Sequence, residues 1–201
     1  MKNSTELSEL AGAYIERLNK ACSLIPLDRV EELGEALLDC WKTGKQVFII
    51  GNGGSAGNAI HLANDFIYGI SKALSSGIRM HALPANQAML SCLGNDLGYD
   101  CVFSHQLAVM GSSGDLLIAL SGSGNSPNIL RAIKHARLLK MRSFAILGYT
   151  GGMALELCDC AIHVPVNDMQ ISEDSQLIVG HILMQWLYAQ RDSVAMMGPK
   201  L

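Results

Sequence analysis

The chain has 201 residues, of which 49% are hydrophobic and 16% are charged, and its formal net charge is −3. This length and composition predict a single domain with one substantial core. The negative balance, with lysines and arginines scattered except for a modest cluster in 131–142, argues against nucleic-acid binding.

Two amphipathic helices are predicted at the start of the chain. Apolar residues recur at helical spacing from Thr5 to Ile25. Pro26 opens a second periodic stretch, with Asp28 as its expected cap, and Gly44 ends it. We expect residues 1–45 to form a helical hairpin that packs on the same domain or on a partner subunit.

From residue 46 onward, short apolar runs alternate with helical patterns. The expected strands are 46–51, 78–84, 115–121, 143–148 and 161–166. The expected helices are the His61 region, a broken 87–110, 127–140, a short helix near Met153, and 172–190. Such alternation indicates parallel strands joined by crossover helices that cover both faces of a sheet. The predicted fold class is therefore α/β, a doubly wound, Rossmann-like parallel sheet flanked by helices over 46–192, followed by a tail at 193–201.

Two loops rich in glycine, serine and asparagine follow two of these strands. "GNGGS" comes after the first strand and "SGSGNS" after the third, and a helical pattern begins behind each. Ligands of open α/β sheets bind at the carboxyl ends of the strands, so both loops should face one crevice. Backbone N–H groups in such loops, with the helix dipoles behind them, bind phosphate without a lysine. The alternative for either loop alone is a tight turn, with Ser126 serving only as a helix cap.

The same loops lack the features of nucleotide motifs. A P-loop requires a lysine after its last glycine, and neither loop has one. Gly51, Gly53 and Ala56 match a dinucleotide fingerprint, but the next strand ends without the acidic residue that binds ribose. We therefore expect no nucleotide cofactor.

Two pairs of ionisable residues complete the pattern. His61 and Asp65 are four apart, hence on one face of the helix behind the first loop. Glu173 and His181 are eight apart on the last helix, within about 80° of each other around its axis. His181 lies among apolar residues, where an imidazole requires a partner such as a carboxylate or a metal ion. The alternative is a solvated glutamate and a histidine satisfied at a helix interface.

At these motifs the sequence resembles the sedoheptulose-7-phosphate isomerase (phosphoheptose isomerase) family of SIS domains. The similarity covers nearly the whole chain and rests on "GNGGSAGNAIHLAND", "LSCLGNDLGYDCVFSHQL", "GDLLIALSGSGNSPNIL" and the closing helix. It implies a homotetramer with active sites between subunits, and an aldose–ketose isomerase that converts sedoheptulose 7-phosphate to a manno-heptose 7-phosphate through an enediol. The alternatives are an isomerase of another sugar phosphate and a non-catalytic SIS adaptor of the replication-initiation type.

The resemblance also assigns site residues. Those implied to bind the open-chain sugar phosphate are Asn52, Gly53, Gly54, Ser55, Asn95, Asp96, Ser121, Gly122, Ser123, Ser126 and Glu173. Some family members bind zinc through His, Glu, Gln and His, which correspond here to His61, Asp65, Glu173 and His181. Two of the four differ from the family, yet two histidines and two carboxylates still suit zinc or another divalent metal.

For the chemistry we assign Asp65 as the base at C1 and C2 and His181 as the acid at oxygen. A metal bound to His61 and Glu173 would polarise the carbonyl. Without a metal, paired carboxylates in one crevice would suit a general acid or base near neutrality. The sequence leaves both versions open.

The cysteines and the hydropathy indicate where in the cell the protein is expected to reside. The six cysteines form no C-x-x-C pair, and we expect them to be reduced and mostly buried: Cys22, Cys40, Cys92, Cys101, Cys158 and Cys160. The chain starts without an apolar leader and has no uncharged apolar run of membrane-spanning length. We therefore expect a cytoplasmic protein that does not engage membranes.

Overall fold

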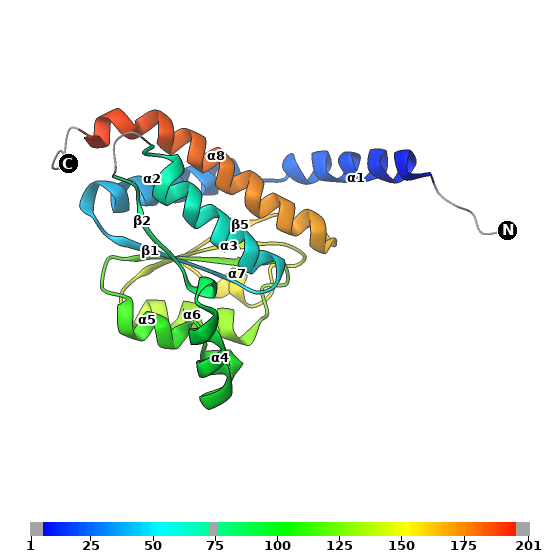
Figure 1. Cartoon of the computed structure of the whole chain (residues 1–201). Coiled ribbons are helices and arrows are strands. Elements are labelled where there is room, and N and C mark those ends of the chain that lie inside the picture. Colours follow the sequence, from blue (N-terminus) through cyan, green and yellow to red (C-terminus); the bar gives the residue numbers. More distant parts are fainter. Residues whose placement is uncertain (1–5, 73–75, 196–201) are drawn as a thin grey trace.

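A central parallel sheet organises the chain (Figure 1). The computed structural model describes residues 6–72 and 76–195. Its strands lie in the order β2-β1-β3-β4-β5: β1 (Gln46–Gly51), β2 (Arg79–Ala82), β3 (Leu116–Ser121), β4 (Arg142–Leu147) and β5 (Cys160–His163). All neighbouring pairs are parallel, as predicted. β2 and β5 are shorter than expected because Pro84 and Pro165 cannot donate to a strand neighbour.

The helices also follow the predicted order. They are α1 (Leu7–Cys22), α2 (Leu27–Thr43), α3 (Gly54–Asn64), α4 (Gln87–Asp96), α5 (Ser104–Met110), α6 (Pro127–Leu138), α7 (Ala154–Leu157) and α8 (Met169–Ala195). A π-helical turn (Asp65–Gly69) continues α3, and 3-10 turns occupy Leu83–Ala85 and Tyr99–Cys101. Gly98, with φ of 96°, separates α4 from the second 3-10 turn and produces the expected break.

Two expected boundaries were wrong. Pro26, not Asp28, is the N-cap of α2, because the N–H groups of Arg29 and Val30 both bond to the Pro26 carbonyl, and Asp28 lies inside the first turn. α8 runs on to Ala195, so residues 193–195 are helical rather than tail. The rest of the expected tail, 196–201, and Thr5 lie outside the described residues.

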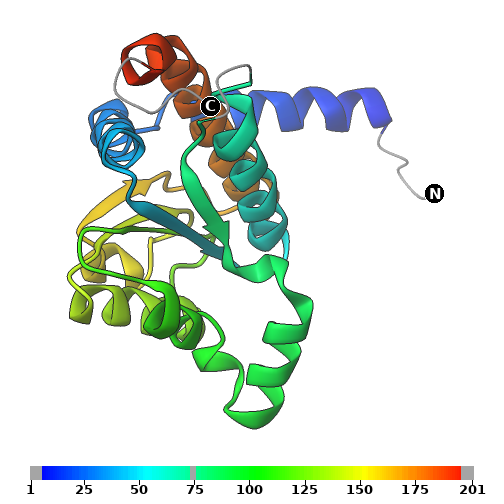
Figure 2. The same ribbon diagram turned by 60° about the vertical axis from the view of Figure 1, so that its left-hand side comes forward.

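Two helical layers cover the two faces of the sheet. Figures 1 and 2 show α2, α3 and α8 on one face and α5 and α6 on the other. Alternate residues of β1 divide between the two cores: Val47 and Ile49 pack with the first layer, and Phe48 and Ile50 with the second. Because α3 follows β1 and α6 follows the adjacent β3, the chain winds in opposite directions from these neighbours. The sheet therefore has a topological switch point between β1 and β3, where ligands of such folds bind.

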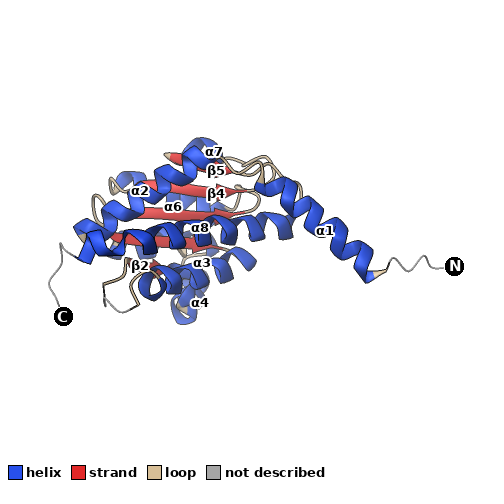
Figure 3. Cartoon of the chain, turned by 90° about the horizontal axis from the view of Figure 1, so that it is seen from above, coloured by secondary structure: helices blue, strands red, loops and turns tan. Residues whose placement is uncertain are grey.

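α1 does not fold back on α2 as the expected hairpin would. Figures 1 and 3 show it pointing away from the body of the fold. Its polar contacts are with the start of α8: the Tyr14 hydroxyl donates to Asp174 Oδ2 at 2.6 Å, and Arg17 Nε lies 3.5 Å from Asp168 Oδ2. The Asp174 hydrogen bond raises the pKa of Tyr14 to about 12.

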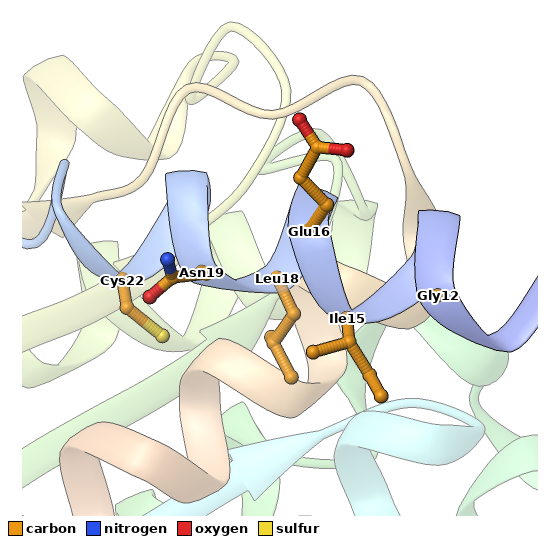
Figure 4. Close-up of a pocket in the computed structure, with 6 residues that line it drawn as sticks. All are labelled: Gly12, Ile15, Glu16, Leu18, Asn19 and Cys22. Carbon is orange, nitrogen blue, oxygen red and sulfur yellow. The ribbon is translucent and has the colours of Figure 1, made fainter.

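The apolar side of α1 is largely uncovered. Leu7, Leu10 and Ile15 are 82%, 55% and 65% exposed. Figure 4 shows Ile15 and Leu18 pointing to one side of the helix and Glu16 to the other, beside a groove of about 420 Å³. None of the helices described here combines the length and apolar composition needed to cross a membrane.

Candidate active site

The two glycine-serine loops line one pocket, as the sequence predicted. Its volume is about 280 Å³, and we call it the loop pocket. It is lined by Asn52, Gly53, Gly54, Ser55, Leu120, Ser121, Gly122, Ser123, Ser126, Met169 and Glu173. Leu120 and Met169 were not predicted, although Met169 precedes Glu173 by one helical turn on α8 and so shares its face.

Two serine hydroxyls of the loop pocket accept hydrogen bonds from within the fold. Ser55 Oγ accepts from Gln176 Nε2 at 3.0 Å, and Ser121 Oγ accepts from the Gly124 N–H at 3.0 Å. Each hydroxyl thereby keeps its proton for a ligand, because an accepted hydrogen bond occupies only a lone pair. Ser126 is the N-cap residue of α6, but its side chain makes no capping hydrogen bond. Helix capping therefore does not account for its hydroxyl.

The pocket also carries one negative charge. A Cβ placed on Gly54 would lie 2.3 Å from Glu173 Oε2, so this carboxylate lies directly against the first residue of α3. Glycine is needed at that position for the close approach. A carboxylate at a helix N-terminus is favourable, and it occupies the same electropositive region that would attract an anionic ligand.

A second cluster lies further along the same two helices. His61 Nε2 and His181 Nε2 are 2.9 Å apart, and Asp65 Oδ2 is 3.4 Å from the first and 3.5 Å from the second. The side chains are 48%, 42% and 16% exposed for His61, His181 and Asp65. His181 therefore has the partners that its apolar surroundings required, and three possible metal-ligating atoms converge on one point.

Close helix packing brings this cluster together. A Cβ on Gly180 would lie 2.3 Å from Leu62 Cδ2, so α8 and α3 approach closely at the residues next to His181 and His61. Asp65 is the first residue of the π-helical turn, in which the Ile70 N–H bonds to the Asp65 carbonyl at 3.0 Å. The imidazoles and the carboxylate thus come from two helices that pack closely, and side-chain hydrogen bonds between Asn58 and Ser55 of α3 and residues of α8 also join them.

Glu173 does not join this cluster in the structure. The metal-ligating group consists of His61, Asp65 and His181, whereas the Glu173 carboxylate leans toward Gly54. The physical reason is the rise of the helix: eight residues separate Glu173 from His181 by about 12 Å along α8, even though they share a face.

Asn95 and Asp96 are not brought to the loop pocket of their own chain. Both lie exposed on α4, where Asn95 Nδ2 donates to Asp96 Oδ1 at 2.8 Å. Figures 1 and 2 show α4 extending away from the sheet. Asn128 and Tyr99 are residues that the sequence analysis missed, since both contact Asn52 of the first loop.

The cysteines form no part of either cluster. All six are free thiols, and Cys40, Cys101, Cys158 and Cys160 are buried. Burial raises the pKa of the Cys40 and Cys158 thiols to about 11 and that of Cys160 to about 12, which makes them unreactive near neutral pH.

Comparison with known proteins gives this geometry a family. The SIS domain profile matches residues 13–148. Phosphoheptose isomerase 1 of Campylobacter jejuni is 38% identical over 157 residues, which are 78% of this chain and 84% of the relative. The phosphoheptose isomerase of Burkholderia pseudomallei is 36% identical over 182 residues, 89% of this chain and 92% of the relative. The structure of the phosphoheptose isomerase from Neisseria gonorrhoeae superposes with a TM-score of 0.84 at 27% identity, covering 92% of this chain and all of that one. The chain therefore belongs to the phosphoheptose isomerase family of SIS-domain proteins.

Proposed function

We infer that the chain is an aldose–ketose isomerase that converts sedoheptulose 7-phosphate to a manno-heptose 7-phosphate. The observation that supports this best is the pairing of two sites on α3 and α8, a loop pocket of hydrogen-bond donors and a cluster of two imidazoles and a carboxylate. His61 follows Gly54 by about 10 Å along α3. One site would hold the phosphate and the other the reacting carbons.

In this assignment the loop pocket binds the substrate and the cluster on α3 and α8 transfers protons. The loop pocket binds the phosphate through the backbone N–H groups of Gly53 and Gly54 and the hydroxyls of Ser55, Ser121, Ser123 and Ser126. Asp65 takes the proton from C1 and returns it at C2. In the metal-free site His181, within 3.5 Å of the same carboxylate, moves the proton from O1 to O2. Binding of the phosphate in the loop pocket would position C1 and C2 of the substrate beside the base and the acid.

We propose that His61, Asp65 and His181 bind a divalent metal, with zinc as the best match. Tetrahedral zinc with bonds of 2.0–2.1 Å requires ligand atoms about 3.3 Å apart. The three atoms here are 2.9, 3.4 and 3.5 Å apart, so the residues fit the ion. A bound metal would supply polarisation of the substrate carbonyl in place of the His181 proton, and Asp65 Oδ1 would remain available as the base.

The direct test is turnover of sedoheptulose 7-phosphate by the full chain, with and without chelator. We expect conversion to a manno-heptose 7-phosphate, and a screen of five- to seven-carbon ketose phosphates should show the highest kcat/KM for the seven-carbon substrate. Preference for a shorter sugar would reassign the substrate. Absence of turnover with every sugar, together with a stable protein partner in a pull-down, would favour the adaptor alternative.

Changing Glu173 to glutamine should strengthen phosphate binding. The carboxylate lies against Gly54, where α3 offers its N-terminal N–H groups. Removing this like charge is expected to increase the affinity for inorganic phosphate about tenfold, because two charges several ångströms apart near a protein surface repel by roughly 1–2 kcal/mol. Isothermal titration measures the change. Glu35→Gln, at an exposed glutamate of α2, is the matched control. Weaker binding in Glu173→Gln would instead show that the carboxylate supports the ligand.

We further propose a homotetramer with active sites between subunits. The uncovered Leu7, Leu10 and Ile15 of α1 support a subunit contact there. An intersubunit site would allow Asn95 and Asp96 of the exposed α4 to reach the substrate of a neighbouring subunit. A cytoplasmic location belongs to the same proposal and is supported by six free thiols, four of them buried.

A further inference from the structure

Asn52 is tied to residues outside the loop pocket that it lines. Its side chain exchanges two hydrogen bonds with Asn128, in which Nδ2 of each amide donates to Oδ1 of the other at 2.9 Å. The Tyr99 hydroxyl donates to the same Asn52 Oδ1 at 3.2 Å. Asn128 is the second residue of α6 and only 2% exposed. The first loop is therefore joined to the helix behind the second loop by a buried amide.

The main chain fixes the direction of these hydrogen bonds. The Ile129 N–H, which can only donate, lies 3.0 Å from Asn128 Oδ1. This contact determines which atom of the Asn128 amide is oxygen, and the paired hydrogen bonds then determine the orientation of the Asn52 amide. With Asn52 so oriented, Tyr99 must donate to it.

These contacts determine whether Asn52 presents a hydrogen-bond donor or an acceptor to the pocket. An amide oxygen accepts two hydrogen bonds, and both positions on Asn52 Oδ1 are occupied by Asn128 and Tyr99. One of the two N–H groups of Asn52 is used by Asn128. Toward a ligand Asn52 can therefore offer one N–H and no acceptor, and the Ser55 and Ser121 hydroxyls can add donors beside it. A phosphate group carries acceptor oxygens and suits such a surface.

We propose that Asn128 and Tyr99 are positioning residues that hold Asn52 as a hydrogen-bond donor to the phosphate oxygens of the bound ligand. The ligand class in this statement rests on the proposed function. The two residues act through Asn52, and neither lines the loop pocket. Losing either one frees the Asn52 amide to rotate and to present its oxygen to an anion.

A double-mutant cycle with inorganic phosphate tests this on the full chain. Asn52→Ala and Asn128→Ala should each weaken phosphate binding about tenfold, the usual loss for one hydrogen bond to a charged group. The double variant should bind no more weakly than Asn52→Ala, because Asn128 acts only through Asn52. Asn86→Ala, an exposed asparagine that caps α4, is the matched control and should bind as the wild type does.

Several results would overturn the donor role of Asn52. Additive losses in the cycle would show that Asn128 acts independently, and phosphate binding too weak to measure in the wild type would show that the pocket does not hold the anion. Tyr99 is 56% exposed, so Tyr99→Phe should fold even where Asn128→Ala does not. It should weaken phosphate binding about threefold, and unchanged affinity contradicts the role of Tyr99.

Kinetics separate positioning from general damage to the fold. In folded Asn128→Ala the KM for the sugar phosphate should rise about tenfold while kcat changes little, even though loss of this buried amide lowers the thermal midpoint. A fall in kcat with unchanged KM contradicts positioning. The phosphate cycle does not depend on turnover. Predicted coupling in a protein that converts no sugar phosphate would therefore contradict the proposed function alone.

Discussion

Asp65→Asn is expected to lower kcat for sedoheptulose 7-phosphate by roughly 10²–10⁴-fold, the range for losing a positioned general base. Asparagine keeps the size of the side chain but cannot accept the C1 proton. The Kd for the sugar phosphate should change little, because the pocket proposed to hold the phosphate lies about three helical turns before Asp65. Steady-state kinetics and isothermal titration measure the two effects separately.

The control for this change is Asp39→Asn, at an exposed aspartate of α2, which should leave kcat as it is. Because Asp65 also lies in the candidate metal group, zinc affinity must be measured in the same variant. Loss of turnover with zinc still bound assigns the defect to the base, whereas turnover that survives the change rules Asp65 out as that base.

Gly124→Ala is expected to lower the free energy of unfolding by about 3 kcal/mol or more, through left-handed backbone strain and a steric clash. Gly124 has φ of 66°, and a Cβ there would lie 1.9 Å from the Gly151 carbonyl oxygen. The clash is with main chain, which cannot rotate away. The Gly124 carbonyl also accepts from the Ala154 N–H at 2.9 Å, so moving the loop breaks a contact with α7.

Urea denaturation with linear extrapolation measures this loss. Gly12→Ala provides the comparison, since a Cβ on that α1 residue meets nothing within 4 Å. It should leave stability unchanged or raise it by up to about 1 kcal/mol, the difference in helix propensity. Equal stability of Gly124→Ala and wild type would mean that the loop can adopt another path.

The sheet and its loops were predictable because their signals are local. β1 and β3 are short, mostly apolar runs, and glycine-serine loops follow them directly. Parallel connection then requires both loops to meet at one end of the sheet. His61 and Asp65 were predictable for the same reason, since a separation of four residues in a helix brings side chains together.

Other features depend on residues far apart in the chain. The partner of Asn128 is 76 residues away, and nothing in "SPNIL" distinguishes this asparagine from an ordinary polar residue at a helix start. The amphipathic pattern of α1 indicates that an apolar side will be covered, but it does not say by which surface. The angle around α8 correctly placed Glu173 and His181 on one face of the helix. The rise of eight residues along the axis nevertheless keeps Glu173 out of the cluster around His181.

The π-helical turn after α3 makes the length of this segment a constraint in itself. Its hydrogen bond joins Asp65 to Ile70, which is fully buried, so one turn carries an acid facing the imidazoles and a side chain facing the core. Deleting a single residue between them would restore a regular helix and rotate everything beyond by about 100°. Ile70 would then leave the core, or the acid would leave the imidazoles. We therefore expect homologous chains that lack one residue in this turn to carry a longer acidic side chain, such as glutamate, at the position of Asp65.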